Sequence, residues 1–181
     1  DYRLDAQEII KTLEAGKIIL TRRATLTLPI GVQYCCCGVS EDYRNLTKVI
    51  REKFPDYYDE YINFMEHNNK ISLYCMFIMK YDDFIKYCEW LFAVLAEVEP
   101  LVPYQYYNTY LKRVFTIMAE RLMNLYVRKN RMRVKYSNIN FYVEDEKISS
   151  PKNTLETIYD YVVRAGSRFK KELDLLLLKL R

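Results

Sequence analysis

The stretch 108–129 contains polar residues whose spacing could bring chemistry to one face of a helix. Arg113, Glu120 and Asn124 stand seven and four residues apart and share that face with Ile117. Arg113 and Glu120 would lie roughly 10 Å apart along the axis, a separation that could span a diphosphate and an attacking hydroxyl group. A guanidinium would stabilise charge on the diphosphate, and a carboxylate would orient or deprotonate the hydroxyl. Spacing alone favours a simpler alternative, a solvated face with i,i+4 pairs.

A second set of candidates is aromatic. The loop 99–107 contains Tyr104, Tyr106 and Tyr107, and Trp90 precedes it on a predicted helix. An aromatic face fits the C–H face of a sugar ring, so these side chains are candidates for stacking on a glycan. The alternative is that they pack inside the protein, as most aromatic side chains do.

The five cysteines predict neither a disulfide framework nor a metal site. Three of them are consecutive, at 35–37, which does not suit pairing and indicates a reducing compartment. Zinc ligands normally come in spaced pairs, and the single histidine, His67, lies in a polar turn. We interpret Cys75 and Cys88 as small core residues. Whether residues 35–37 are reactive or merely tolerated stays open.

Composition indicates one globular domain with a hydrophobic core. The chain has 181 residues, of which 50% are hydrophobic and 29% charged. The net charge is +4, but seven basic and four acidic residues follow Ser150, so the rest of the chain is nearly neutral. A nucleic-acid interface normally needs basic residues clustered on the folded body, so we do not expect one. The chain contains no run of about 18 apolar residues, so we do not predict a membrane span.

Helices alternate with strands along the chain, which predicts an α/β fold. We expect helices at 6–15, 40–54, 55–67, 82–98, 108–129 and 153–181, and strands at 17–20, 70–80 and 131–144. Residues 70–80 are nearly all apolar, so we expect a central strand that is buried on both faces. Residues 21–40 show no helical period and predict a long loop, a kind of segment that often has a function.

The end of the chain forms a separate region in this prediction. Residues 145–153 are polar, and 153–181 alternate apolar and basic residues with the period of a helix. Such a helix could lie on a membrane surface or pack against a partner protein, and the sequence does not choose between them.

Four stretches in this order resemble a known family. They are DYRNLTKVIREKFPDYYDEY, CMFIMK, YCEWLF and YLKRVFTIMAERLMNLYV. The resemblance covers roughly residues 5–143, and the family is one of bacterial capsular and exopolysaccharide biosynthesis proteins, a domain of unknown function regarded as glycosyltransferases. It implies a partial A-type glycosyltransferase fold, a mixed sheet flanked by helices, in residues 1–143, followed by a linker and an amphipathic tail helix in 144–181.

The same resemblance implies roles for individual residues. Glu120 and Asp42 would be the catalytic carboxylates, which orient or deprotonate the acceptor hydroxyl. Arg113 and Arg121 also match charged positions of the family and would bind the substrate. Asn124, from the spacing on the helix, and Tyr104 and Tyr106, from their aromatic rings, are further candidates for substrate binding. The substrates would be a nucleotide sugar and a growing cell-surface polysaccharide, in the cytoplasm and in peripheral contact with the inner membrane through residues 153–181.

The chain also departs from the family pattern. The family has Asn where this chain has Cys75, Gln where it has Leu111, and a His before Asp42. The family's N-terminal half, with a His-Tyr-Arg-Arg motif, would precede Asp1, and we expect that half to bind the nucleotide and a divalent cation, Mn²⁺ or Mg²⁺. No Asp-x-Asp metal motif occurs here, so we expect the chain alone to be inactive. The alternative is a non-catalytic domain that binds a glycan or a partner.

Overall fold

The computed structural model describes residues 5–138. In chain order these form α1 (Ala6–Glu14), β1 (Lys17–Thr21), β2 (Ala24–Thr25), α2 (Ile30–Cys37), α3 (Ser40–Lys53), α4 (Pro55–His67), β3 (Lys70–Ile71), β4 (Phe77–Ile78), α5 (Tyr81–Val98), three 3₁₀ turns (Glu99–Leu101, Tyr104–Tyr106 and Leu111–Arg113), α6 (Val114–Lys129) and β5 (Arg133–Ser137). The fold is α/β, with a small mixed sheet flanked by helices, as predicted. The predicted linker and helix at 144–181 lie outside the described residues.

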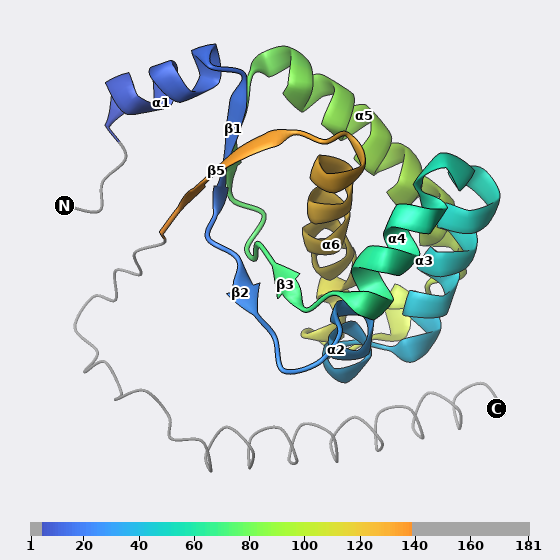
Figure 1. Ribbon diagram of the computed structural model, residues 1–181. Helices are drawn as coiled ribbons and strands as arrows, with labels where there is room; N and C mark the ends of the chain where they lie inside the picture. Colours follow the sequence, from blue (N-terminus) through green and yellow to red (C-terminus); the bar gives the residue numbers. More distant parts are fainter. Residues whose placement is uncertain (1–4, 139–181) are drawn as a thin grey trace, which may run out of the picture.

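β1 is the central strand of a three-stranded sheet in the order β4-β1-β5. Its residues 18–20 are apolar and at most 3% exposed, as expected of a strand with both faces covered. β5 runs parallel to β1, from Lys17 opposite Arg133 to Thr21 opposite Ser137, and β4 runs antiparallel. Beyond the end of β1, β2 and β3 form a short antiparallel ribbon (Figure 1).

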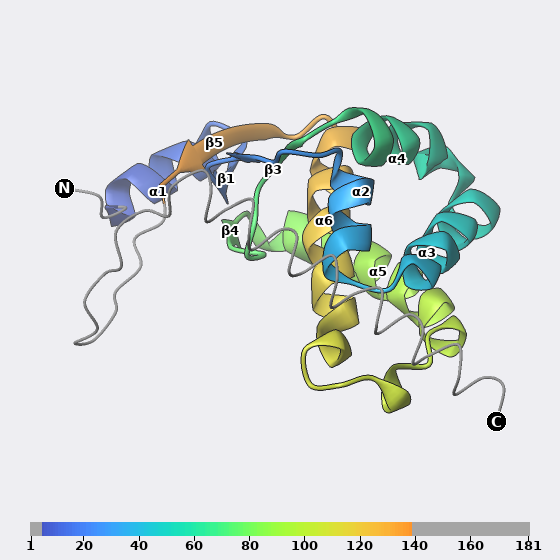
Figure 2. The same cartoon turned by 90° about the horizontal axis from the view of Figure 1, so that it is seen from below.

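α6 lies in the middle of the molecule, with α2, α4 and α5 around it (Figures 1 and 2). All residues from Arg121 to Val127 are buried, so almost two turns of this helix have protein on every side. A helix covered in this way must satisfy any polar side chain internally. Arg121 and Asn124 are the two polar residues in that stretch, and their partners define the candidate site.

The helices predicted at 40–54, 55–67 and 82–98 are confirmed as α3, α4 and α5. Pro55 occupies the first turn of α4, where its missing N–H costs nothing. Within residues 5–138, no helix has both the length and the apolar character needed to cross a bilayer.

The prediction of a long loop at 21–40 is wrong, because this stretch contains β2 and α2. α2 has no amphipathic period that a reader of the sequence could detect, since its eight residues IGVQYCCC are mostly apolar or small. Tertiary packing stabilises it instead: Ile30, Gly31 and Tyr34 are buried. Residues 35–37 therefore lie on a helix.

The prediction of a continuous central strand at 70–80 is also wrong. β3 and β4 are two residues each and belong to different sheets. Between them, Tyr74 and Cys75 have φ values of 73° and 49°, in the left-handed region that breaks a strand. The apolar composition predicted burial correctly for Ile71, but it does not encode the turn.

The helix predicted at 108–129 begins later than expected. Residues Leu111–Arg113 form a 3₁₀ turn, and α6 starts at Val114, with Arg113 as its N-cap residue. The side chain of Asn108 accepts a hydrogen bond from the N–H of Leu111 (3.0 Å), which fixes the turn. Arg113 is therefore exposed at the N-cap of the helix, whereas Glu120 and Asn124 lie within it.

Candidate functional site

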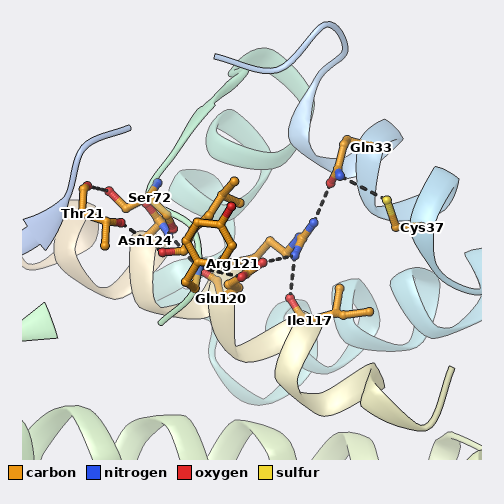
Figure 3. Close-up of polar contacts among 10 residues, drawn as sticks. Thr21, Gln33, Cys37, Ser72, Ile117, Glu120, Arg121 and Asn124 are labelled. Carbon is orange, nitrogen blue, oxygen red and sulfur yellow. Dashed lines mark hydrogen bonds and ion pairs between the residues drawn. The ribbon is translucent and has the colours of Figure 1, made fainter. Parts of the chain in front are cut away.

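The centre of the candidate site is an ion pair between neighbouring residues of α6. Nη1 of Arg121 lies 2.8 Å from Oε2 of Glu120 and also donates to the carbonyl oxygen of Ile117 (3.0 Å). Nη2 donates to Oε1 of Gln33 on α2 (2.5 Å), as Figure 3 shows. The side chain of Arg121 is 4% exposed and that of Glu120 18%. The guanidinium thus joins α6 to α2, and the carboxylate keeps limited access to solvent.

Gln33 extends this connection. Its Nε2 donates to Sγ of Cys37, one turn further along α2 (3.1 Å), so its amide is held in one orientation (Figure 3). The guanidinium of Arg121 also lies over the ring of Tyr34, 5.5 Å from its centroid. A buried cation is stable only when partners surround it, and α2 supplies two of them.

The segment that follows β3 is fixed to α6 by Asn124. Its Oδ1 accepts the N–H of Ser72 (2.9 Å), and its Nδ2 donates to the carbonyl oxygens of Ser72 and Glu120 (2.8 Å each). The hydroxyl of Ser72 donates to the carbonyl of Thr21, at the end of β1, and the Thr21 hydroxyl donates to the carbonyl of Leu73. These bonds connect α6, the segment after β3 and the carboxyl end of β1.

The turn at Tyr74 and Cys75 is the strained part of the site. Two successive residues other than glycine with positive φ are uncommon, and such strain persists only where the surroundings enforce it. Here Oε1 of Glu120 accepts the N–H of Tyr74 (2.7 Å). Burial, with a further contribution from Glu120, raises the pKa of the Cys75 thiol to about 11, so this thiol is not a nucleophile near neutral pH.

Asp42 has a different set of neighbours. It is 1% exposed in the first turn of α3, and the hydroxyl of Tyr107 donates to its Oδ1 (2.7 Å). Burial first, and then this hydrogen bond, raises the pKa of Tyr107. Burial also raises the pKa of Tyr34, which is raised further by Asp42 and lowered by Arg121. Both charged groups therefore lie near Tyr34.

The remaining predicted binding residues lie on the segment between α5 and α6. Tyr106 is 70% exposed and Tyr104 36% exposed, and the Tyr104 hydroxyl donates to Oε1 of Glu99 (3.2 Å). The ring of Tyr104 meets Phe115 edge to face. Arg113 is exposed at the N-cap of α6. The structure thus brings together Glu120, Arg121 and Asn124, and it places the two tyrosines and Arg113 on a different segment.

Sequence reasoning missed three members of the site. Gln33 lies in a stretch predicted to be a loop, and Ser72 and Tyr74 take part mainly through their main-chain groups, which no side-chain pattern reveals. Within residues 5–138, no three His, Cys, Asp or Glu side chains are grouped so that they could hold a metal ion. The described residues therefore do not supply a ligand set for a divalent cation.

Comparison with known proteins identifies the family of this chain. Residues 1–131 match the family described as a domain of unknown function, DUF4422. The chain belongs to this family. No curated protein matches it.

This DUF4422 chain is also similar to a solved structure, the apo structure of the bifunctional glycosyltransferase WbbM. The TM-score is 0.66 and the sequence identity 25%, over 73% of this chain. The match spans 25% of the WbbM chain, so the similarity concerns one part of a larger protein. The DUF4422 chain is glycosyltransferase-like, which confirms the general class that the resemblance implied.

Proposed function

We propose that this chain is part of a glycosyltransferase that transfers a sugar from a nucleotide-sugar donor to a growing cell-surface polysaccharide. The observation that carries the proposal is the similarity to WbbM over 73% of the chain. Fold similarity does not by itself define a reaction, and a transferase of this kind also requires a group that can act on the acceptor.

Glu120 is the better placed of the two predicted catalytic carboxylates. Its side chain is 18% exposed, whereas Asp42 is 1% exposed and hydrogen-bonded to Tyr107. Arg121 and the N–H of Tyr74 hold the two oxygens of Glu120 in fixed positions, and each oxygen still has a lone pair for a further donor. A positioned carboxylate of this kind suits an acceptor hydroxyl.

In the proposed transfer, one bond to the anomeric carbon replaces another. The bond between the anomeric carbon and the diphosphate oxygen breaks, and its electron pair leaves with the diphosphate. The acceptor oxygen bonds to the anomeric carbon, and its proton passes to the carboxylate of Glu120. The half-exposed side chain of Tyr74, whose N–H Glu120 holds, would lie beside the acceptor and offer a ring face for stacking.

A second candidate function is a non-catalytic domain that binds a glycan. The internal contacts of Glu120, Arg121 and Asn124 favour it, because each has a structural partner that would explain its presence without any reaction. In that case the exposed Tyr106 and Tyr74 would be the binding groups.

A transfer assay on the full-length protein that contains this chain separates these functions. We expect transfer of a labelled sugar from one of a panel of nucleotide sugars to polysaccharide, and a loss of about 100-fold or more in kcat for Glu120→Gln. Glu97→Gln is the matched control, since Glu97 is on the surface of α5 and lies 3.9 Å from Lys53. Circular dichroism would show that both variants fold. Folded wild-type protein that binds polysaccharide but transfers no sugar from any donor would favour the second function.

A further inference from the structure

Two arginines follow β1 directly, at the edge of the sheet where its parallel strands end. Arg22 and Arg23 are both exposed. The N–H of Arg22 donates to the carbonyl oxygen of Ser137 (2.7 Å), which extends the β1–β5 ladder by one bond and fixes the backbone at this position. In open α/β sheets, ligands bind outside the carboxyl ends of the parallel strands, and β1 and β5 both end here.

The charges at this edge are not neutralised within the described part of the chain. None of the ion pairs among residues 5–138 includes Arg22, Arg23 or Lys70, an exposed lysine that lies opposite Thr25 in the β2–β3 ribbon. The guanidinium of Arg23 lies over the ring of Tyr136, 4.9 Å from its centroid, which limits its position and leaves its donors available. The end of the sheet therefore carries two cations, and the adjoining ribbon carries a third.

Arg121 differs from these residues because its terminal side-chain nitrogens are already hydrogen-bonded and its charge is already paired. It is 3% exposed, and its two terminal nitrogens already donate to Glu120, Ile117 and Gln33. Its charge is compensated by Glu120 at 2.8 Å. A diphosphate needs donors that are still available, so Arg22 and Arg23 are better suited to bind one than Arg121 is.

The same edge adjoins the strained turn. Thr21, the residue before Arg22, is bonded to Ser72 and to Leu73, and Tyr74 follows directly with half of its surface exposed. Arg22 and Tyr74 thus each follow directly after the residues whose hydrogen bonds join β1 to this segment. The carboxylate of Glu120 accepts the N–H of Tyr74 and so belongs to the same set of connected residues.

We propose that Arg22 and Arg23, together with Lys70, form a binding subsite for the diphosphate group of a substrate. The choice of a diphosphate rests on the proposed transfer function, in which this group accumulates charge as it leaves. Two planar guanidinium groups bind phosphate oxygens in pairs, and Lys70 adds a point charge. Thr21 and residues 72–74 connect the subsite to Glu120, so the leaving group and the acceptor hydroxyl would be bound on either side of these hydrogen bonds.

Isothermal titration of the full-length protein with inorganic pyrophosphate, at constant ionic strength set with chloride, tests the subsite. We expect saturable binding, and binding at least about tenfold weaker in Arg22→Ala/Arg23→Ala. Lys48→Ala/Arg51→Ala is the matched control, because it removes two exposed residues of the same charge from α3. It should bind as the wild type does. The affinity of Arg22→Lys/Arg23→Lys for pyrophosphate should be intermediate, since lysine keeps the positive charge but lacks the paired donors of a guanidinium.

Two competitors identify the source of the diphosphate. Displacement of pyrophosphate by uridine diphosphate assigns the subsite to a nucleotide donor, and displacement by farnesyl diphosphate alone assigns it to a lipid-linked acceptor. Equal losses in both double-alanine variants, or no saturable binding by the folded wild type, overturn the proposal. Pyrophosphate binding requires no transfer, so the subsite and the proposed function can fail independently.

Discussion

At the scale of single residues, Asn124 shows how one side chain can define a site without touching a ligand. Its amide presents one acceptor and two donors, and all three are used by the main chain around Ser72 and Glu120. These bonds replace the strand pairing that residues 72–76 lack. That Asn124 also binds substrate stays a prediction, whereas its role in positioning this segment follows from its contacts.

The first prediction tests that role by replacing the Nδ2 donor of Asn124 with a carboxylate oxygen, which can only accept. Asn124→Asp keeps the shape of the side chain but places a carboxylate oxygen against two carbonyl oxygens inside the protein. We expect the free energy of unfolding to fall by about 3 kcal/mol, because a buried charge is left facing acceptors. Urea unfolding measures this loss.

Asn45→Asp is the control for this substitution. Nδ2 of Asn45 donates to the carbonyl of Leu101 at an exposed position, so water can replace the bond, and we expect a change of less than about 1 kcal/mol. Similar losses in the two variants would show that the amide of Asn124 is not specifically required.

At the scale of elements, the secondary structure of long periodic segments was predicted correctly from the sequence, and that of short segments was not. α3, α4 and α5 have 13 to 18 residues each, enough for their apolar period and their boundaries to be visible. α2 has eight residues and is held by packing, and β3 and β4 have two each. Segments this short contain too few residues for a period to be recognised.

The same difference of scale explains which site residues could be found. Glu120, Arg121 and Asn124 lie on one long helix, so spacing could group two of them, and the family resemblance added Arg121. Gln33 could not be found, because it reaches Arg121 from 88 positions away in the sequence and from an unrecognised helix. The strained turn at Tyr74 was hidden by an apolar run that is typical of a strand.

The second prediction concerns the close packing of α2. A Cβ atom at Gly31 would lie 2.7 Å from Oη of Tyr43 and 3.1 Å from the main-chain oxygen of Met65. The main-chain oxygen of Met65 belongs to α4, so it can move only if that helix moves. Gly31→Ala should therefore destabilise the protein by about 1–2 kcal/mol, since overpacking exceeds the gain in helix propensity. A lower urea midpoint would show this.

Gly38→Ala provides the comparison for Gly31→Ala. At Gly38 an added Cβ would have its nearest neighbours at 3.5 Å, an ordinary contact, and the backbone there is extended. We expect a change within about 0.5 kcal/mol. If Gly31→Ala were equally neutral, α2 would not be held as closely to α3 and α4 as the structure places it.

At the scale of the whole molecule, buried tyrosines are a shared feature of the core. The chain has 18 tyrosines, and Tyr34, Tyr61, Tyr87 and Tyr107 are each at most 5% exposed. Burial is the first cause of the raised pKa of all four hydroxyls. Burial also raises the pKa of Tyr43 to about 12. Ionising any of them would place an anion in the core.

The third prediction follows from this feature and concerns alkaline pH. In the unfolded chain Cys75 titrates near 9.0 and the tyrosines near 10.0, whereas in the folded protein the pKa values are about 11 for Cys75 and about 12 for Tyr43. Between these values the unfolded state binds fewer protons than the folded state, so the free energy of unfolding falls as pH rises. The loss should begin near pH 9 with Cys75 and steepen above about pH 10, where several tyrosines contribute together.

Urea unfolding at several pH values from neutral to about 11, with tyrosinate absorbance recorded in parallel, measures this loss. Cys75→Ala should remove the part that begins near pH 9. Tyr106→Phe should leave the curve unchanged, since Tyr106 is 70% exposed, whereas Tyr43→Phe should make it less steep above pH 10. A free energy of unfolding that stayed constant up to about pH 11 would contradict the burial of these hydroxyls, and with it the arrangement of helices around α6 that covers them.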